Sequence, residues 1–129
     1  MARLLYHLTF AADWAASRPS GLHAMSGRGM TLEQQGFVHL CFADQVPGVV
    51  SRYWQEPTAP VVLLTVDPDL LPHAVVLENT SGGAERFPHF YGPLPVTAVV
   101  ASATLPSDGR GGLVLPVLPD ERDHRTTGD

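Results

Sequence analysis

The chain has very little cysteine and few basic residues. Cys41 is the one cysteine among 129 residues. A single cysteine excludes an intramolecular disulfide framework and a CxxC zinc site, and it suits a reducing compartment. Eight Lys plus Arg against thirteen Asp plus Glu give a formal net charge of −5. Phosphate backbones bind clustered positive charge, so this balance argues against duplex nucleic acid as the main partner.

Long hydrophobic runs are also missing. No stretch approaches the roughly 20 apolar residues of a membrane span, and residues 1–7 lack the apolar run of a signal peptide. We therefore expect a cytoplasmic protein with no membrane partner. A hydrophobic content of 44% in 129 residues predicts one folded domain. We place that domain at residues 1–118 and expect the charged segment 119–129 to be a disordered tail. The oligomeric state is left open.

Short strands and helices are expected to follow one another along the first third of the chain. Residues 4–8 read as a strand, and Thr9 as the N-cap of a helix that ends at residues 17–19. Residues 20–30 show no periodicity, which predicts a mobile loop that could serve as a lid. Thr31 is expected to begin a capping box at the start of a short helix, and Gly36 to end that helix.

The stretch 37–42 is apolar on both faces apart from His39, which predicts a central strand of a sheet. The two-residue period of a strand puts His39 and Cys41 on the same face. Asp44 is expected to cap the next helix, with Pro47 in its first turn. Further strands are predicted over residues 60–66, 74–78 and 96–103, with a weaker edge strand over 113–118.

The stretch 85–95 holds three aromatic residues, three prolines, a histidine and an acid-base pair. Proline restricts the backbone, and exposed aromatic residues are unfavourable, so this stretch is not a solvated linker. It can be read as one wall of a binding site. It can equally be read as an ordered loop whose aromatic side chains only fill the core.

Three histidines, His7, His39 and His89, fall on or beside predicted strands. If they converge, they line one cleft, where a histidine can bind a ribose hydroxyl or phosphate, or act as a general acid or base. The alternative is that each histidine satisfies a local hydrogen bond in the core. A zinc site at His39 and Cys41 with His7 or His89 has no supporting ligand spacing, and nothing in the sequence indicates a lowered pKa for a Cys41 nucleophile.

Five separated motifs occur along the chain. They are Tyr6-His7-Leu8-Thr9, Gly36-Phe37-Val38-His39-Leu40, Gln45-Val46-Pro47-Gly48-Val49, Leu63-Leu64-Thr65-Val66-Asp67-Pro68 and Phe87-Pro88-His89-Phe90-Tyr91-Gly92-Pro93-Leu94. In this order they resemble the family known as domain of unknown function 952, and the resemblance covers about residues 4–101.

The resemblance implies a compact ADP-ribosyltransferase-like fold and NAD as the cofactor. In such proteins an aromatic-His-Gly-Thr strand holds the NAD ribose, and here Leu8 replaces the glycine after His7. A second strand lines the nicotinamide pocket, and the stretch around His39 resembles it, with Cys41 where relatives commonly have serine. A late-strand acid completes the pattern; Glu85 and Glu78 are the available acids, and Glu85 is the candidate. A carboxylate there would stabilise an oxocarbenium-like centre.

We therefore expect an α+β fold of two small, bent, mostly antiparallel sheets with two or three helices. The expected function is a small-molecule transferase that binds NAD or a nucleotide-like ligand. Two alternatives are a non-catalytic nucleotide or metabolite binding module and a tailoring enzyme that uses the histidines for acid-base chemistry. The expected catalytic residues are Glu85 and His39, and the expected ligand-binding residues are His7, Thr9, His39, Arg52, His89 and Tyr91.

Overall fold

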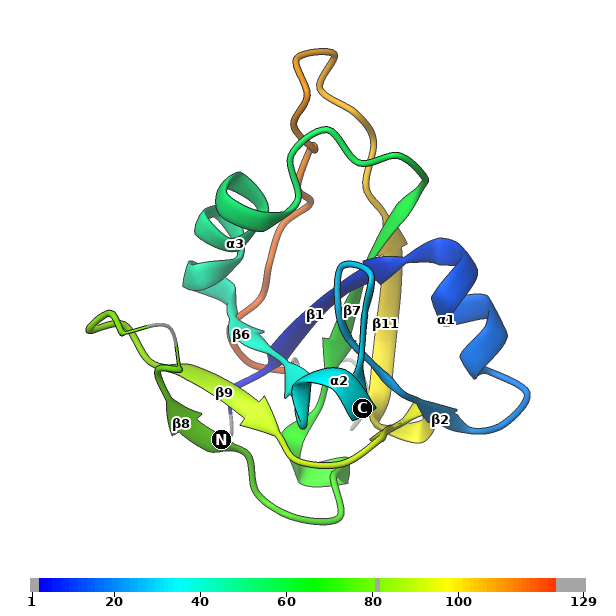
Figure 1. The fold of residues 1–129 in the computed structure, drawn as a ribbon, viewed down its shortest axis with the longest axis vertical. Helices are drawn as coiled ribbons and strands as arrows, with labels where there is room; N and C mark the ends of the chain where they lie inside the picture. Colours follow the sequence, from blue (N-terminus) through cyan, green and yellow to red (C-terminus); the bar gives the residue numbers. More distant parts are fainter. Residues whose placement is uncertain (1–2, 81, 123–129) are drawn as a thin grey trace, which may run out of the picture.

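A four-stranded antiparallel sheet runs through the centre of the molecule (Figure 1). The structure is a computed structural model that describes residues 3–80 and 82–122. The strand order is β11 (Val99–Thr104), β7 (Val61–Val66), β1 (Leu5–Phe10) and β6 (Cys41–Phe42). β1 and β7 pair over six residues and are apolar throughout most of their length, because both faces of this sheet are covered.

A second, three-stranded sheet lies beside the first and consists of β5 (Val38–His39), β9 (Phe87–Phe90) and β8 (Val76–Glu78), in that order. Two strand pairs complete the β structure of the described residues. They are β10 (Leu94–Pro95) with β2 (Leu22–His23), and β3 (Met25–Gly27) with β4 (Met30–Thr31). The fold is thus α+β, as expected, with several small antiparallel sheets rather than two.

The described residues contain three α-helices, at the upper end of the expected number: α1 (Ala11–Ser17), α2 (Leu32–Gln35) and α3 (Val46–Tyr53). Short 3-10 turns occupy Ala43–Gln45, Pro68–Leu70 and Val96–Ala98. Val46 and Val50 of α3, and Trp54 directly after it, pack in the core at the four-residue spacing of one helix face.

The predicted central strand over 37–42 is divided between two sheets. β5 pairs with β9 in the three-stranded sheet, and β6 pairs with β1 in the four-stranded sheet, each at the edge of its sheet. The prediction of one central strand was therefore wrong, although Phe37, Val38, Leu40 and Cys41 of this stretch are buried. The alternation of side chains is kept: His39 and Cys41 face the pocket described below, while Val38 and Leu40 belong to the core on the other side.

The predicted helix ends were partly confirmed. The Thr31 hydroxyl accepts from the Gln34 amide, the Gln34 side chain accepts from the Thr31 amide, and Gly36 ends α2 with φ 95°. Thr9 does not cap α1: it lies in β1 opposite Val62. Asp44 does not cap α3 either, because it lies inside a 3-10 turn before the helix.

Two apolar clusters pack on opposite faces of the four-stranded sheet. One contains Tyr6, Leu8, Leu63 and the buried face of α3; the other contains Leu5, Val38, Val66 and Phe90. The period of two along β1 therefore assigns alternate residues to different clusters. No helix within the described residues has the length and apolar content needed to cross a membrane.

Two further segments differ from expectation. The stretch 20–30 holds β2, β3 and the turn into β4 rather than an irregular loop. Residues 113–118 form no strand, but Leu113, Leu115 and Leu118 pack on the core near α3.

Residues 119–122, placed by sequence in a disordered tail, contact the start of β1. The Tyr6 hydroxyl donates to the Pro119 carbonyl, the Leu4 amide donates to the Asp120 carbonyl, and Arg122 pairs with Asp67 at 2.9 Å. The domain boundary after residue 118 stays a prediction, and residues 123–129 of the expected tail lie outside the described residues.

Candidate functional site

A pocket of about 380 Å³ opens between the three-stranded sheet, α3 and the β3–β4 hairpin. The sheet contributes His39, Phe87 and His89. Val49, Tyr53 and Trp54 come from α3 and the residue after it, and the hairpin contributes Ser26, Gly27, Arg28 and Met30. Tyr6 and Leu8 of β1 and Cys41 of β6 also line it. The walls are largely apolar and aromatic, with a small number of polar groups, which is typical of a small-molecule site.

The strand register brings His39 and His89 together. β5 and β9 are antiparallel with His39 directly opposite His89, so both side chains project from one face of the sheet. Their ring centroids are 5.2 Å apart at an interplanar angle of 84°. Phe37 stacks on His89 at 4.0 Å and 17°, and this contact fixes the plane of the His89 ring.

Glu78 orients His89 from the neighbouring strand. Nδ1 of His89 lies 3.0 Å from Oε1 of Glu78, and the Tyr91 hydroxyl donates to the same carboxylate oxygen. Nδ1 therefore carries the proton, and Nε2 has no hydrogen-bond partner within the described residues. The hydrogen bond from Tyr91, and then that from His89, lower the pKa of Glu78, so this residue is a carboxylate at neutral pH. The same bond to Glu78 raises the pKa of Tyr91.

His39 faces the pocket with an exposed side chain. Desolvation by the surrounding protein, and then the neighbouring His89, lower the pKa of His39. Its exposure to solvent limits the desolvation. The imidazole of His39 is therefore neutral at neutral pH and can either donate or accept a hydrogen bond in the pocket.

His7 lies away from the pocket, in a buried chain of hydrogen bonds. Its Nδ1 donates to the His39 carbonyl at 2.7 Å, because a carbonyl can only accept. Its Nε2 is 3.2 Å from Nε2 of His23, whose Nδ1 is 2.6 Å from the Ser17 hydroxyl. Burial, and then the charge of His23, lower the pKa of His7 to about 3. Burial lowers the pKa of His23 to about 4, although Asp13 opposes the shift.

The Thr9 side chain is buried on the same face of β1 as His7, and its hydroxyl oxygen has no hydrogen-bond partner among the described residues. Thr9 and His7 are both absent from the walls of the pocket. The structure thus groups these two predicted ligand-binding residues with the core on the far side of β1.

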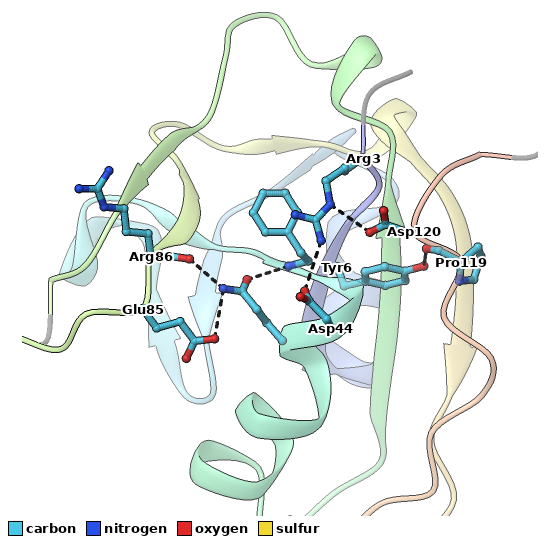
Figure 2. A network of polar contacts seen from close by, with 9 residues as sticks. Arg3, Tyr6, Asp44, Glu85, Arg86, Pro119 and Asp120 are labelled. Atoms are coloured by element: carbon cyan, nitrogen blue, oxygen red, sulfur yellow. Dashed lines mark hydrogen bonds and ion pairs between the residues drawn. The ribbon is translucent and has the colours of Figure 1, made fainter.

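Arg52 and Glu85 pair with each other outside the pocket walls. Their side chains are about half exposed and meet at 3.1 Å. The Gln45 amide donates to the Glu85 carboxylate at 3.4 Å and to the Arg86 carbonyl at 2.8 Å. Figure 2 shows Glu85 and Arg86 in this group. The Glu85 carboxylate is therefore occupied by Arg52 and Gln45, and its catalytic role stays a prediction.

Of the predicted site residues, the structure brings together His39 and His89, with Tyr91 joined to them through Glu78. The acid that bonds His89 is Glu78. The sequence offered both Glu78 and Glu85, and it favoured Glu85. Trp54 and Arg28 were not predicted as site residues. Glu78 reaches His89 because β8 pairs with β9. This pairing makes Glu78 a diagonal cross-strand neighbour of His89 on the same face of the sheet.

Cys41 contacts the pocket but is held as a thiol. Burial raises the pKa of Cys41 to about 12, and the thiol lies 3.6 Å from the Tyr6 carbonyl. A thiolate nucleophile is therefore not formed at neutral pH. In residues 3–80 and 82–122, no group of three or more His, Cys, Asp or Glu side chains is arranged to hold a metal ion.

Comparison with known proteins identifies the family. Residues 8–102 match the family described as "Protein of unknown function (DUF952)". The chain belongs to the DUF952 family. This match extends over most of the folded domain and includes both pocket histidines.

Solved structures of the protein CC0527 from Caulobacter crescentus are similar to this DUF952 chain. Its crystal structure is 30% identical, with a TM-score of 0.73 over 86% of this chain and 93% of that one. A double mutant of the same protein gives 29% identity and the same TM-score, and its solution NMR structure gives 30% and 0.68. None of the curated proteins matches this DUF952 chain significantly.

Proposed function

We propose that the pocket binds a small planar molecule and that His89, oriented by Glu78, transfers a proton to or from it. The observation that carries this proposal is the hydrogen bond of 3.0 Å between His89 and Glu78, at a histidine that lines the pocket. A carboxylate behind an imidazole fixes its tautomer and stabilises the imidazolium formed when the ring accepts a proton. The protein is then an acid-base enzyme acting on a small metabolite.

The rings around the pocket support a planar ligand. Tyr53 and Trp54 at the end of α3 and Phe87 of β9 all line the pocket, so the walls suit the faces and edges of a flat group. His39 adds one neutral hydrogen-bonding group next to His89. Cys41 is protonated, so the chemistry rests on proton transfer rather than on a covalent thioester or thiohemiacetal.

The test combines binding with turnover. A panel of small planar metabolites is screened by thermal stabilisation, and each ligand found is then incubated with the protein in D2O and followed by proton NMR. Loss of a substrate proton signal or appearance of a product supports the proposal. His89→Gln should reduce that rate by about 10²- to 10⁴-fold, the usual contribution of a general base.

Two matched variants separate orientation from structure. Glu78→Gln still accepts the hydrogen bond from Nδ1 but lacks the charge, so we expect a lower rate with ligand stabilisation retained. Glu33→Gln changes an exposed acid on α2 that does not line the pocket, and the rate should not change. Ligand binding without any chemical change, in the wild type, would make the protein a binding module and contradict the proposal.

NAD-dependent transfer is the second candidate, and with it the finer assignment to an ADP-ribosyltransferase-like fold. What favours it is the carboxylate of Glu78 on a late strand beside two histidines and an aromatic wall that suits a nicotinamide ring. Incubation with NAD should then raise the melting temperature and release nicotinamide. Stabilisation without nicotinamide release would support a nucleotide-binding module. The absence of both effects would contradict the NAD hypothesis.

A further inference from the structure

Arg28 lies on the pocket wall at the turn of the β3–β4 hairpin and reaches the C-terminal end of α3. Its Nη1 donates to the carbonyls of Tyr53 and Gln55 at 3.3 and 2.7 Å, and its Nη2 donates to the Glu56 carbonyl at 3.3 Å. The guanidinium carbon stands 5.7 Å from the centre of the Trp54 ring. These contacts hold the guanidinium group at the aromatic side of the pocket.

The hydrogen bonds leave one edge of this guanidinium group without a protein acceptor. Arginine has five N–H donors, and the three bonds use Nη1 and one hydrogen of Nη2. The Nε–H and the second N–H of Nη2 have no acceptor within the described part of the chain. Nε and Nη2 lie on the same edge of the guanidinium group, and such an edge matches the two oxygens of a carboxylate.

The charge of Arg28 is also incompletely balanced. Arg3, Arg52 and Arg122 each pair with a carboxylate, whereas Arg28 meets only backbone carbonyls in residues 3–80 and 82–122. The end of a helix supplies about half a negative charge. A net positive charge therefore remains at this wall, while His39 is neutral and Glu78 lies behind His89 at the other.

We propose that Arg28 is the anion-binding residue of the pocket and that the ligand is a small planar carboxylate. Its carboxylate binds the free edge of Arg28, its flat body lies among Trp54 and Phe87, and the rest of the molecule faces His39 and His89. This proposal rests on the proposed function for its choice of pocket. It concerns binding alone, so it can hold or fail independently of proton transfer at His89.

The test uses two unreactive probes of nearly equal shape, benzoate and benzamide, with binding followed by amide chemical shifts of the full chain. We expect benzoate to bind at least tenfold more tightly than benzamide and to shift the amides of residues 26–30 and of Trp54. Added salt should weaken benzoate binding alone. Inorganic phosphate is included to distinguish a carboxylate site from a general anion site, and tighter binding of phosphate than of benzoate would overturn the carboxylate assignment.

Arg28→Gln should abolish the preference for benzoate, and Arg28→Lys should retain part of it without the bidentate geometry. Arg18→Gln, at an exposed arginine after α1, is the matched control and should keep the full preference. If Arg28→Gln disrupts the hairpin, its amide chemical shifts will differ from those of the wild type before any probe is added. In that case the salt dependence of benzoate binding to the wild type is the test of the proposal. Equal affinities for the two probes, or binding of neither, would overturn the proposal.

Discussion

His89 in the pocket and the buried pair His7 and His23 differ in the charge of their hydrogen-bond partners. His89 has the Glu78 carboxylate on Nδ1, which can stabilise a protonated ring. The hydrogen-bond partners of His7 and His23 are a carbonyl, each other and a hydroxyl, all of them uncharged, and the charge of Asp13 only partly offsets the effect of burial on His23. The first environment suits proton transfer, and the second suits a neutral core.

The buried pair makes a prediction about acid stability. The pKa values of His7 and His23 are lowered from 6.5 to about 3 and about 4. The unfolded chain therefore binds more protons than the folded one between pH 6.5 and about 4. Stability is fully present above pH 6.5 and is lost as the pH falls, by roughly 2 kcal/mol per histidine at pH 4.5. Urea unfolding at several pH values measures this.

The variant His23→Gln isolates that effect. It removes one titrating ring, so the decline in unfolding free energy between pH 7 and pH 4.5 should become shallower, even if stability at pH 7 is lower. Val62→Ala, a buried change without a titrating group, should lower stability at every pH and leave the slope unchanged. An equal slope in His23→Gln and the wild type would show that His23 is charged or solvated in the folded protein.

At the residue scale, sequence alone singled out some of the residues that line the pocket and not others. His39 and His89 were recognisable because each is a polar residue in an apolar strand, and that pattern needs no tertiary information. Sequence alone could not show which acid, Glu78 or Glu85, bonds His89. This depends on the register of β8 against β9, and the chain between these strands is a glycine-containing loop whose length does not determine a register.

At the element scale, the stretch 37–42 shows what periodicity can and cannot predict. Alternation along the chain correctly placed His39 and Cys41 on one face, because each half of the stretch is extended. The division into β5 and β6 could not be predicted, since the change of partner at Leu40 is set by β9 on one side and β1 on the other. The pocket lies where these two sheets separate.

Capping at α2 can be tested at this scale. α2 holds the chain between the β3–β4 hairpin and β5, so its start affects two walls of the pocket. Thr31→Ala removes the hydroxyl that accepts from the Gln34 amide, and the unfolding free energy should fall by about 1 kcal/mol. Thr58→Ala, at an exposed threonine between α3 and β7, should change it by less than about 0.5 kcal/mol. Equal effects would mean that the cap contributes nothing.

At the scale of the whole molecule, the four-stranded sheet separates two apolar clusters, and the pocket uses the side that carries α3. Residues far apart in sequence meet on that side: the hairpin near residue 28, the end of α3 and β9. The last described residues pass along the same sheet and contact the beginning of β1 (Figure 2). Composition could not predict this, because the contacts of residues 119–122 are hydrogen bonds and ion pairs rather than apolar packing.

Truncation tests whether residues 119–122 belong to the domain. A chain ending at Leu118 loses the acceptors of the Tyr6 hydroxyl and the Leu4 amide, and it leaves Asp67, whose side chain is 9% exposed, without Arg122. Lost hydrogen bonds cost about 1 kcal/mol each and an unpaired buried charge costs more, so the unfolding free energy should fall by about 3 kcal/mol. A chain ending at Arg122 keeps all of these contacts and serves as the control in the same urea titration. Equal urea midpoints for the two chains would show that residues 119–122 do not contribute to stability.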